Sequence, residues 1–128
     1  MSFQLSVVTP ERAILEVEAR FVVFPAHDGE VGILTNRAPL LCQLGIGILR
    51  VETEDEKQVF MVDGGFAQMV DNKLTILTEQ ARKPSEIDRE AAREALKEAM
   101  ARPASTAEEY DERQKDIRRA RVQLKLEA

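Results

Sequence analysis

Apolar and polar residues alternate with a period of two along much of the first two thirds of the chain. Phe3, Leu5 and Val7 would therefore share one face of a strand. Asp71-Asn72 links two further candidate strands, and a link of two residues suits a tight hairpin. Many short strands at such close spacing predict an all-β sandwich or barrel over residues 1–84. The other short apolar runs are 21–24, 59–62, 66–70 and 73–78.

After Pro84 the apolar residues follow a helical spacing instead. All six glycines precede Pro84, and the segment from Ser85 onward is dense in Ala, Glu, Arg and Lys. Ser85 can cap a helix, with Asp88 at the capping-box position. The helix should end at Arg102, because the residue before a proline avoids the helical conformation. We therefore predict a first helix at about 86–102.

A second helix is predicted at about 106–125. Either Ser105 with Glu108 or Thr106 with Glu109 can form its capping box. The link between the helices is short, so they should lie antiparallel as a hairpin domain of residues 85–128. The apolar stripe of the second helix is narrow (Tyr110, Ile117 and Leu124), and that of the first is rich in alanine. Little area is buried per turn, so we expect the hairpin to be only marginally stable by itself.

The charge balance restricts the possible partners. The chain has 128 residues and a net charge of −5, so a generally basic nucleic-acid footprint is absent. No stretch approaches the roughly 20 apolar residues that cross a bilayer, and no signal peptide is recognisable. Any membrane association is therefore expected to come through partners.

The second predicted helix is locally basic. We interpret this either as a solvated helix face or as a docking face for an acidic partner surface. Nucleic acid is disfavoured as a partner, because only Tyr110 supplies an aromatic ring for stacking. The candidate docking residues are Arg113, Arg118, Arg119, Arg121 and Lys125.

The residues that usually carry catalysis or bind metals are scarce. His27 is the only histidine and Cys42 the only cysteine, so neither an internal disulfide nor a metal site rich in His and Cys can form within one chain. Cys42 lies in an apolar run, which predicts a buried and unreactive thiol. We identify no catalytic residue and no metal ligand, and an enzyme is disfavoured for want of converging groups.

Several ordered motifs resemble the epsilon subunit of the F-type ATP synthase. Residues 24–41 read FPAHDGEVGILTNRAPLL, and residues 7–11 read VVTPE. Gly64-Gly65-Phe66, then Leu74–Leu77, then an Ile87-Asp88 helix start follow in the order of that family. The resemblance covers essentially the whole chain.

The resemblance implies a ten-stranded β-sandwich followed by an antiparallel helix pair. It also implies a non-catalytic rotor subunit in the central stalk of a proton-translocating ATP synthase, on the cytoplasmic face of the bacterial inner membrane. Its expected partners are the gamma subunit, the c-ring and the alpha/beta catalytic head. The sandwich would couple rotation of the ring to the head. The helices would inhibit ATP hydrolysis, either folded on the sandwich or extended toward the head.

The resemblance also assigns roles to single residues. Glu30 falls at the position of the acid that contacts the c-ring. Arg37 falls where the family commonly has histidine, and it would keep its contact with the ring without titrating near neutral pH. Ala26 replaces the usual glycine after Pro25, so the turn there can differ.

A nucleotide site is the least complete part of the resemblance. Some bacterial epsilon subunits bind ATP at the start of the first helix, but Ala91 and Gln123 stand here in place of two arginines. ATP binding is therefore expected to be weak or absent, and no cofactor is expected. The alternative is a helix N-terminus with favourable charge placement. The matching positions are Ile87, Asp88, Ala92 and Arg119.

Two other functions stay open from the residues. One is an ATP-sensing module, for which ATP binding would be the main activity. The other is an unrelated β-sandwich adaptor that docks through its helical tail. The ordered turn motifs favour the rotor subunit over this adaptor, because a generic sandwich has no reason to place them together.

Overall fold

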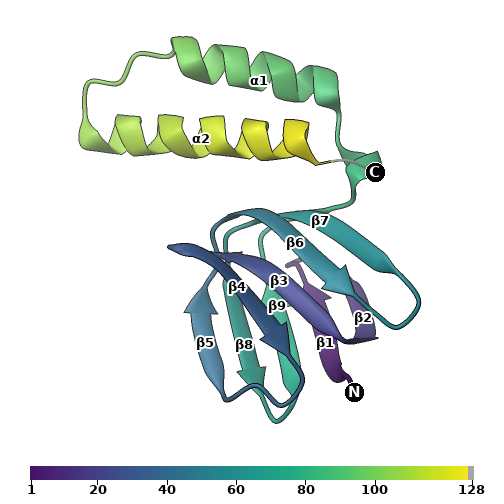
Figure 1. Cartoon of the computed structure of the whole chain (residues 1–128). Helices are drawn as coiled ribbons and strands as arrows, with labels where there is room; N and C mark the ends of the chain where they lie inside the picture. The colour runs from purple at the N-terminus through teal and green to yellow at the C-terminus, as the bar shows by residue number, and fades with distance from the viewer. Residues whose placement is uncertain (127–128) are drawn as a thin grey trace.

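The computed structural model describes residues 1–126, as two packed β-sheets followed by two helices (Figure 1). This confirms the predicted sandwich and helical hairpin; residues 127 and 128 of the predicted hairpin domain lie outside the described part. The strands are β1 (Phe3–Val8), β2 (Ala13–Ala19), β3 (Phe21–Ala26), β4 (Gly29–Leu34), β5 (Leu40–Gln43), β6 (Ile46–Glu52), β7 (Lys57–Asp63), β8 (Phe66–Val70), β9 (Lys73–Leu77) and β10 (Ala81–Arg82). The helices are α1 (Arg89–Ala101) and α2 (Ala107–Lys125).

The two sheets have five strands each and enclose one apolar core. Their strand orders are β2-β1-β9-β8-β5 and β10-β7-β6-β3-β4. Only β1 and β9 pair in parallel; the other pairs within the sheets are antiparallel. Phe3, Leu5 and Val7 are buried on one face of β1, as their alternation predicted. Phe24 and Phe60 from the second sheet complete the same core.

The link between β8 and β9 is the predicted tight hairpin. Asp71 and Asn72 both have positive φ, 52° and 59°. Two successive left-handed residues define a type I′ turn, whose twist matches that of the flanking strands. Asp and Asn are among the residues that tolerate this conformation, so the local sequence specifies the turn.

The chain crosses between the sheets at two glycine-containing links that are hydrogen-bonded to each other. The N–H of Leu44 donates to the carbonyl of Gly65 at 2.8 Å, and that of Gly64 donates to Gly45 at 3.1 Å. Gly65 has φ +107°, and a Cβ atom there would lie 1.8 Å from the carbonyl oxygen of Leu77. Both the backbone conformation and the close approach therefore require glycine at this position.

Helix α1 begins three residues later than predicted, and Ser85 does not cap it. Pro84–Glu86 forms a short 3-10 turn, and Ile87 is extended. Asp88 is the actual N-cap, and its carboxylate accepts a hydrogen bond from the N–H of Ala91 at 3.1 Å. The helix starts late because Ile87 is extended and packs against the apolar cluster beneath the hairpin.

Helix α2 begins at the second of the two candidate caps. The Thr106 hydroxyl accepts from the N–H of Glu109 at 3.1 Å, and the helix ends at Lys125 as predicted. The two helices lie side by side and antiparallel (Figure 1). Ala92, Ala99 and Ala120 are buried. Their small side chains allow the helices to approach closely.

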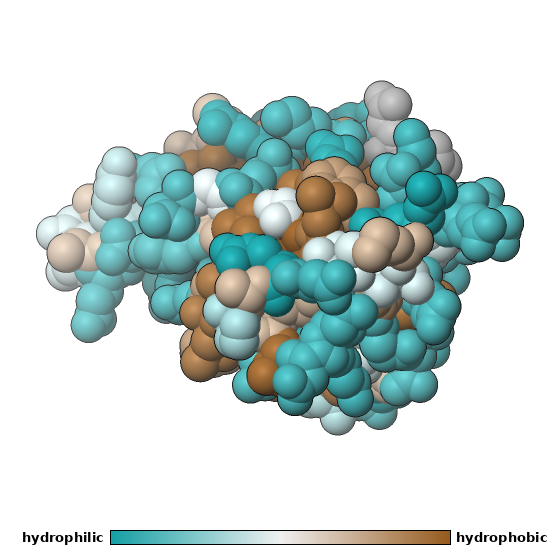
Figure 2. Space-filling view, turned by 60° about the horizontal axis from the view of Figure 1, so that its bottom comes forward, coloured by the Kyte–Doolittle hydropathy of each residue, from teal (hydrophilic) through white to brown (hydrophobic). Residues whose placement is uncertain are grey.

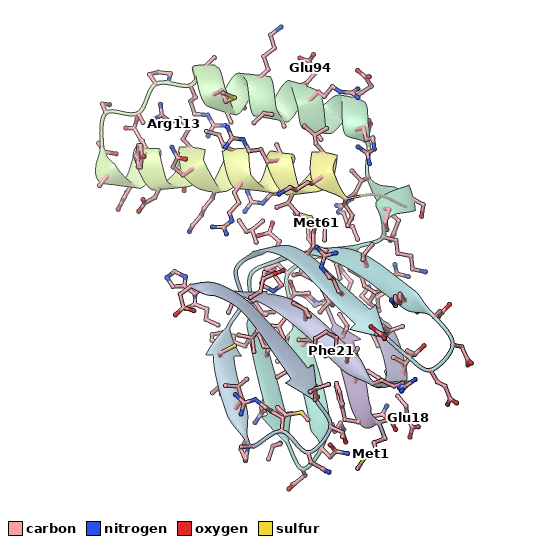
Figure 3. The ribbon with its side chains drawn as sticks, viewed as in Figure 1. Met1, Glu18, Phe21, Met61, Glu94 and Arg113 are labelled. Atoms are coloured by element: carbon pink, nitrogen blue, oxygen red, sulfur yellow. The ribbon has the colours of Figure 1, made fainter. Side chains whose placement is uncertain are left out.

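The hairpin rests on the outer face of the second sheet through a small apolar cluster. Leu126 is buried there against Ile46 and Met61. Figure 3 shows Met61 between the sandwich and the hairpin, on the face of β7 turned toward the helices. Tyr110 was expected in the buried apolar stripe of α2, but this residue is 51% exposed. The N-terminal turns of α2 extend past the sandwich (Figure 1), so the sandwich does not cover that ring.

Cys42 is half-buried at the edge of the core rather than fully buried as predicted. Burial raises the pKa of its thiol, and the nearby charge of Asp28 raises it further. The reactive thiolate is therefore depleted at neutral pH. We expect iodoacetamide to modify Cys42 several-fold more slowly in the folded chain than in the guanidinium-unfolded chain at pH 7.5, as measured by mass spectrometry. Equal rates would show that packing does not protect the thiol.

Candidate functional site

The two predicted ring-contact residues are associated with β4 but lie toward opposite ends of it. Glu30 is exposed near the start of the strand, opposite Pro25 of β3. Arg37 is exposed in the segment that follows the strand. About 13 Å of extended chain separates Glu30 from the end of β4, at roughly 3.3 Å per residue. The structure therefore does not bring these two side chains together into one site.

The five candidate docking residues of α2 divide into two groups. Arg113 and Arg119 interact within the fold. The Nη1 atom of Arg113 donates to the carbonyl of Arg102 at 2.9 Å, and its guanidinium lies 5.3 Å from the ring centre of Tyr110. The other three docking residues are exposed: Arg118, Arg121 and Lys125.

Arg119 is the central member of an ion-pair chain that joins the sandwich to both helices. Its guanidinium binds Asp63 of β7 through two hydrogen bonds, 2.5 and 3.2 Å long, and Asp116 through a third of 2.7 Å. Asp116 also pairs with Arg102 at 2.8 Å, and Arg102 pairs with Glu98 at 2.9 Å. The ion-pair chain consists of Asp63, Arg119, Asp116, Arg102 and Glu98.

The pKa shifts along the ion-pair chain follow its hydrogen bonds. The hydrogen bonds that Arg119 donates to Asp63 raise the pKa of Arg119. The hydrogen bond from Arg102 holds the pKa of Glu98 below its ordinary value. The hydrogen bonds that Arg102 donates to Glu98 and Asp116 raise the pKa of Arg102. Each of these three shifts favours the charged form of its group.

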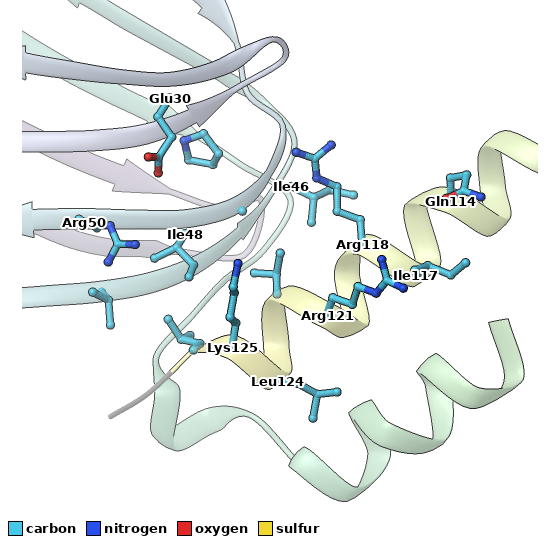
Figure 4. Close-up of a pocket in the computed structure, with 15 residues that line it drawn as sticks. Glu30, Ile46, Ile48, Arg50, Gln114, Ile117, Arg118, Arg121, Leu124 and Lys125 are labelled. Atoms are coloured by element: carbon cyan, nitrogen blue, oxygen red, sulfur yellow. The ribbon is translucent and has the colours of Figure 1, made fainter. Parts of the chain in front are cut away.

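The exposed cations of α2 line a basic groove of about 1160 Å³ between this helix and the second sheet (Figure 4). The sheet contributes Glu30, Arg50 and apolar side chains that include Ile46 and Ile48. Glu30 thus shares this groove with the predicted docking residues. The groove has an excess of positive charge. Its cations are Arg50, Arg118, Arg121 and Lys125.

The four positions that resemble a nucleotide site each have a role within the fold. Asp88 caps α1, and Ala92 is buried. Ile87 packs against the apolar cluster beneath the hairpin. Arg119 is held by Asp63, a carboxylate of the chain itself. These contacts agree with the alternative of a helix N-terminus, and weak or absent ATP binding stays a prediction.

An apolar face on the first sheet is a feature that sequence reasoning missed. It consists of large apolar side chains that point away from the core on neighbouring strands. The register places Phe66 opposite Leu77, and it places Leu41 opposite Gln68, which lies between Phe66 and Val70 on the same face of β8. Apolar residues also interrupt the hydrophilic surface in the view of Figure 2. The sequence feature that could have indicated this face is the run 66–70, because apolar residues occupy both faces of β8. The apolar face comprises Leu41 (68% exposed), Phe66 (53%), Val70 (40%) and Leu77 (50%).

Within residues 1–126, no helix is long and apolar enough to cross a membrane. The same residues contain no group of three or more His, Cys, Asp or Glu side chains that could hold a metal ion.

Comparisons with known proteins agree on one family. Residues 2–84 match the family described as "ATP synthase, Delta/Epsilon chain, beta-sandwich domain". An ATP synthase epsilon chain of Rhodopirellula baltica is 42% identical over 98% of this chain and 98% of its own length. A chloroplastic epsilon chain of Guillardia theta is 36% identical over 97% and 96%.

Solved structures lead to the same result. A chain in the mitochondrial ATP synthase structure of Euglena gracilis has a TM-score of 0.85 and 26% identity, over 94% of this chain and 78% of that one. A chain from the Tetrahymena thermophila mitochondrial enzyme has a TM-score of 0.71 over 95% and 93%; at 15% identity it supports the fold alone. The family match, the near full-length relatives and the fold together establish that this chain belongs to the ATP synthase epsilon chain family.

Proposed function

We propose that the chain is a non-catalytic subunit of the central stalk of an ATP synthase, where it couples rotation of the c-ring to the catalytic head. The Euglena relative belongs to a structure described as OSCP/F1/c-ring, which supports a place between the head and the ring. The gamma subunit, the c-ring and the alpha/beta head are the proposed partners. The chain would associate with the membrane only through this complex.

The apolar face is the observation that carries the proposal. Apolar side chains that are about half exposed or more on neighbouring strands indicate a surface that a partner covers. The hairpin covers the other sheet, so the two surfaces lie on opposite sides of the sandwich. A partner on the apolar face could hold the sandwich while the hairpin moved. We assign this face to the gamma subunit, and Glu30 with Arg37 to the c-ring.

The proposed compartment is the cytoplasmic face of a bacterial inner membrane. The relatives include chloroplastic epsilon chains, and the structural neighbours are mitochondrial. The bacterial setting therefore stays a prediction. Fractionation of the source cells should recover the chain with membranes as long as the ATP synthase is intact. Recovery in the soluble fraction from intact complexes would contradict the proposed attachment.

We further propose that the two helices act as a brake on ATP hydrolysis. Within residues 1–126, the hairpin contacts the sandwich through one small apolar cluster and one ion pair, Arg119 with Asp63. An interface of this size is compatible with release of the hairpin as a unit. In the extended position the basic residues of α2 would be available to the acidic surface of the catalytic subunits.

Removal of residues 85–128 tests the brake. We expect ATP hydrolysis by the assembled complex to rise, because the inhibitory element is gone, while the sandwich still assembles through its apolar face. Hydrolysis is measured on complexes purified with the full-length or the truncated chain, normalised to the amount of gamma subunit. Unchanged hydrolysis in fully assembled complexes would leave the helices without an inhibitory role.

A further inference from the structure

Asp63 and Arg119 are 56 residues apart in the sequence but form a polar contact between the sandwich and the hairpin. Asp63 is the last residue of β7, and its side chain is only 15% exposed. Arg119 lies in the second half of α2 with its side chain 34% exposed. The two hydrogen bonds between them use both carboxylate oxygens. Such a bidentate pair fixes an orientation as well as a distance.

The remaining members of the ion-pair chain extend this contact across the hairpin. Asp116 lies one turn before Arg119 on α2 and binds both Arg119 and Arg102. Arg102 is the C-cap of α1, so the chain connects the sandwich to the end of the first helix as well. The hairpin is therefore braced internally by the same charges that attach it to the sandwich.

The apolar contact by itself does not define the hairpin position as sharply. Leu126, Ile46 and Met61 lie under the C-terminal end of α2, where the chain leaves the helix. Apolar burial is non-directional, so a cluster at one end of a helix permits the helix to swing about it. A directional contact through Arg119, nearly two turns earlier, opposes that swing.

We propose that Asp63 is a built-in anion that latches the hairpin onto the sandwich and sets the balance between the folded and extended positions. This inference rests on the proposed function, in which the extended helices inhibit hydrolysis. The Asp63 carboxylate binds the guanidinium of Arg119. Arg119 is the position where the resemblance places a contact with phosphate. The latch thus needs no added nucleotide to keep the hairpin folded. Loosening it favours extension.

The first experiment measures the hairpin position in the full-length isolated chain. Spin labels are attached at Asp55→Cys, in the exposed β6–β7 turn, and at Glu94→Cys, on the exposed surface of α1, in a Cys42→Ala background. Pulsed electron–electron double resonance then gives the distribution of distances between the two spin labels. The parent should show one narrow distribution, and Asp63→Asn should show an added, longer component.

The expected size of this shift follows from the partial exposure of the pair. We expect the ratio of detached to folded hairpin to increase about threefold to tenfold in Asp63→Asn, as for a partly buried charged hydrogen bond. Arg119→Gln should behave similarly, and the double variant should add little to either single change. Arg93→Gln is the matched control, because it breaks only the Arg93–Glu90 pair on the exposed side of α1.

A distribution that stays unchanged in both Asp63→Asn and Arg119→Gln, with the sandwich still folded by circular dichroism, would overturn the latch. So would an equal response in Arg93→Gln.

Addition of ATP to the parent chain provides a further comparison. A nucleotide-independent latch predicts that ATP leaves the distribution as it is, whereas a marked narrowing on addition of ATP would contradict it.

The second experiment uses the assembled complex and separates the latch from the brake. Asp63→Asn should lower ATP hydrolysis, because it releases the hairpin toward the inhibitory position, whereas truncation after Pro84 should raise hydrolysis. Asp63 stays on the sandwich, so its change removes no group from the extended helices. If truncation has no effect, the brake fails and the distance measurement still decides the latch. If truncation raises hydrolysis and Asp63→Asn leaves it unchanged, the brake stands and the latch fails.

Discussion

A chain that carries Phe66→Asp is expected to fold normally but to lose its attachment to the rest of the rotor. Phe66 is 53% exposed and lies beside Leu77 on the apolar face, so a change there leaves the core intact. A central aromatic residue at an interface commonly contributes about 2 kcal/mol or more, or roughly a 30-fold change in Kd. A buried carboxylate without a partner adds a desolvation penalty, so we expect a larger loss.

The measurement is binding of the purified chain to the gamma subunit, by isothermal titration calorimetry and by co-purification from membranes. Met100→Asp is the matched control, because Met100 is similarly exposed, at 57%, but lies on α1 away from the apolar face. The control should bind like the parent chain. Wild-type affinity for Phe66→Asp, or an equal loss for Met100→Asp, would show that the apolar face is not the contact with gamma.

Replacement of Gly65 by alanine is expected to destabilise the sandwich severely. Gly65 has φ +107°, which side-chain-bearing residues rarely adopt, and the added Cβ would lie 1.8 Å from the carbonyl oxygen of Leu77. The obstacle is backbone within a paired strand, so it cannot rotate aside as a side chain can. We expect the free energy of unfolding to fall by about 4 kcal/mol or more, which is exceptional for one substitution.

Gly64→Ala separates the two physical effects. Gly64 also has positive φ, +70°, but no heavy atom lies within 4 Å of its added Cβ. The Gly64→Ala substitution should lower the free energy of unfolding only by the strain of the left-handed conformation, about 1 to 2 kcal/mol. Urea unfolding, followed by circular dichroism, compares both variants with the parent. Similar losses for the two variants would mean that the approach of Leu77 has no role in holding this crossing.

The position of the hairpin start shows how a local signal can mislead. The local pattern predicts Ser85 as the cap, with Asp88 only as its capping-box partner three residues later. The structure uses the later one, because Ile87 is extended and packs into the apolar cluster beneath the hairpin. That packing depends on strands far away in the sequence, which a local pattern does not contain.

The basic tail residues show the same limit for the candidate site. As a sequence they form a single locally basic helix, and either solvation or docking explains them. The structure uses Arg113 and Arg119 inside the fold and leaves Arg118, Arg121 and Lys125 along the groove. The carboxylate that binds Arg119 comes from β7, so no spacing within α2 could indicate it.

The class of fold, the β8–β9 turn, the end of α2 and the family could all be predicted from the amino-acid sequence. Each of these depends on nearby residues or on ordered motifs: a period of two, a helical period, or a pair of residues that tolerates positive φ. Which surfaces stay exposed and which charges form pairs depends instead on how the elements pack. The apolar face, the basic groove and the latch between Asp63 and Arg119 arise because packing brings together side chains that the sequence keeps far apart.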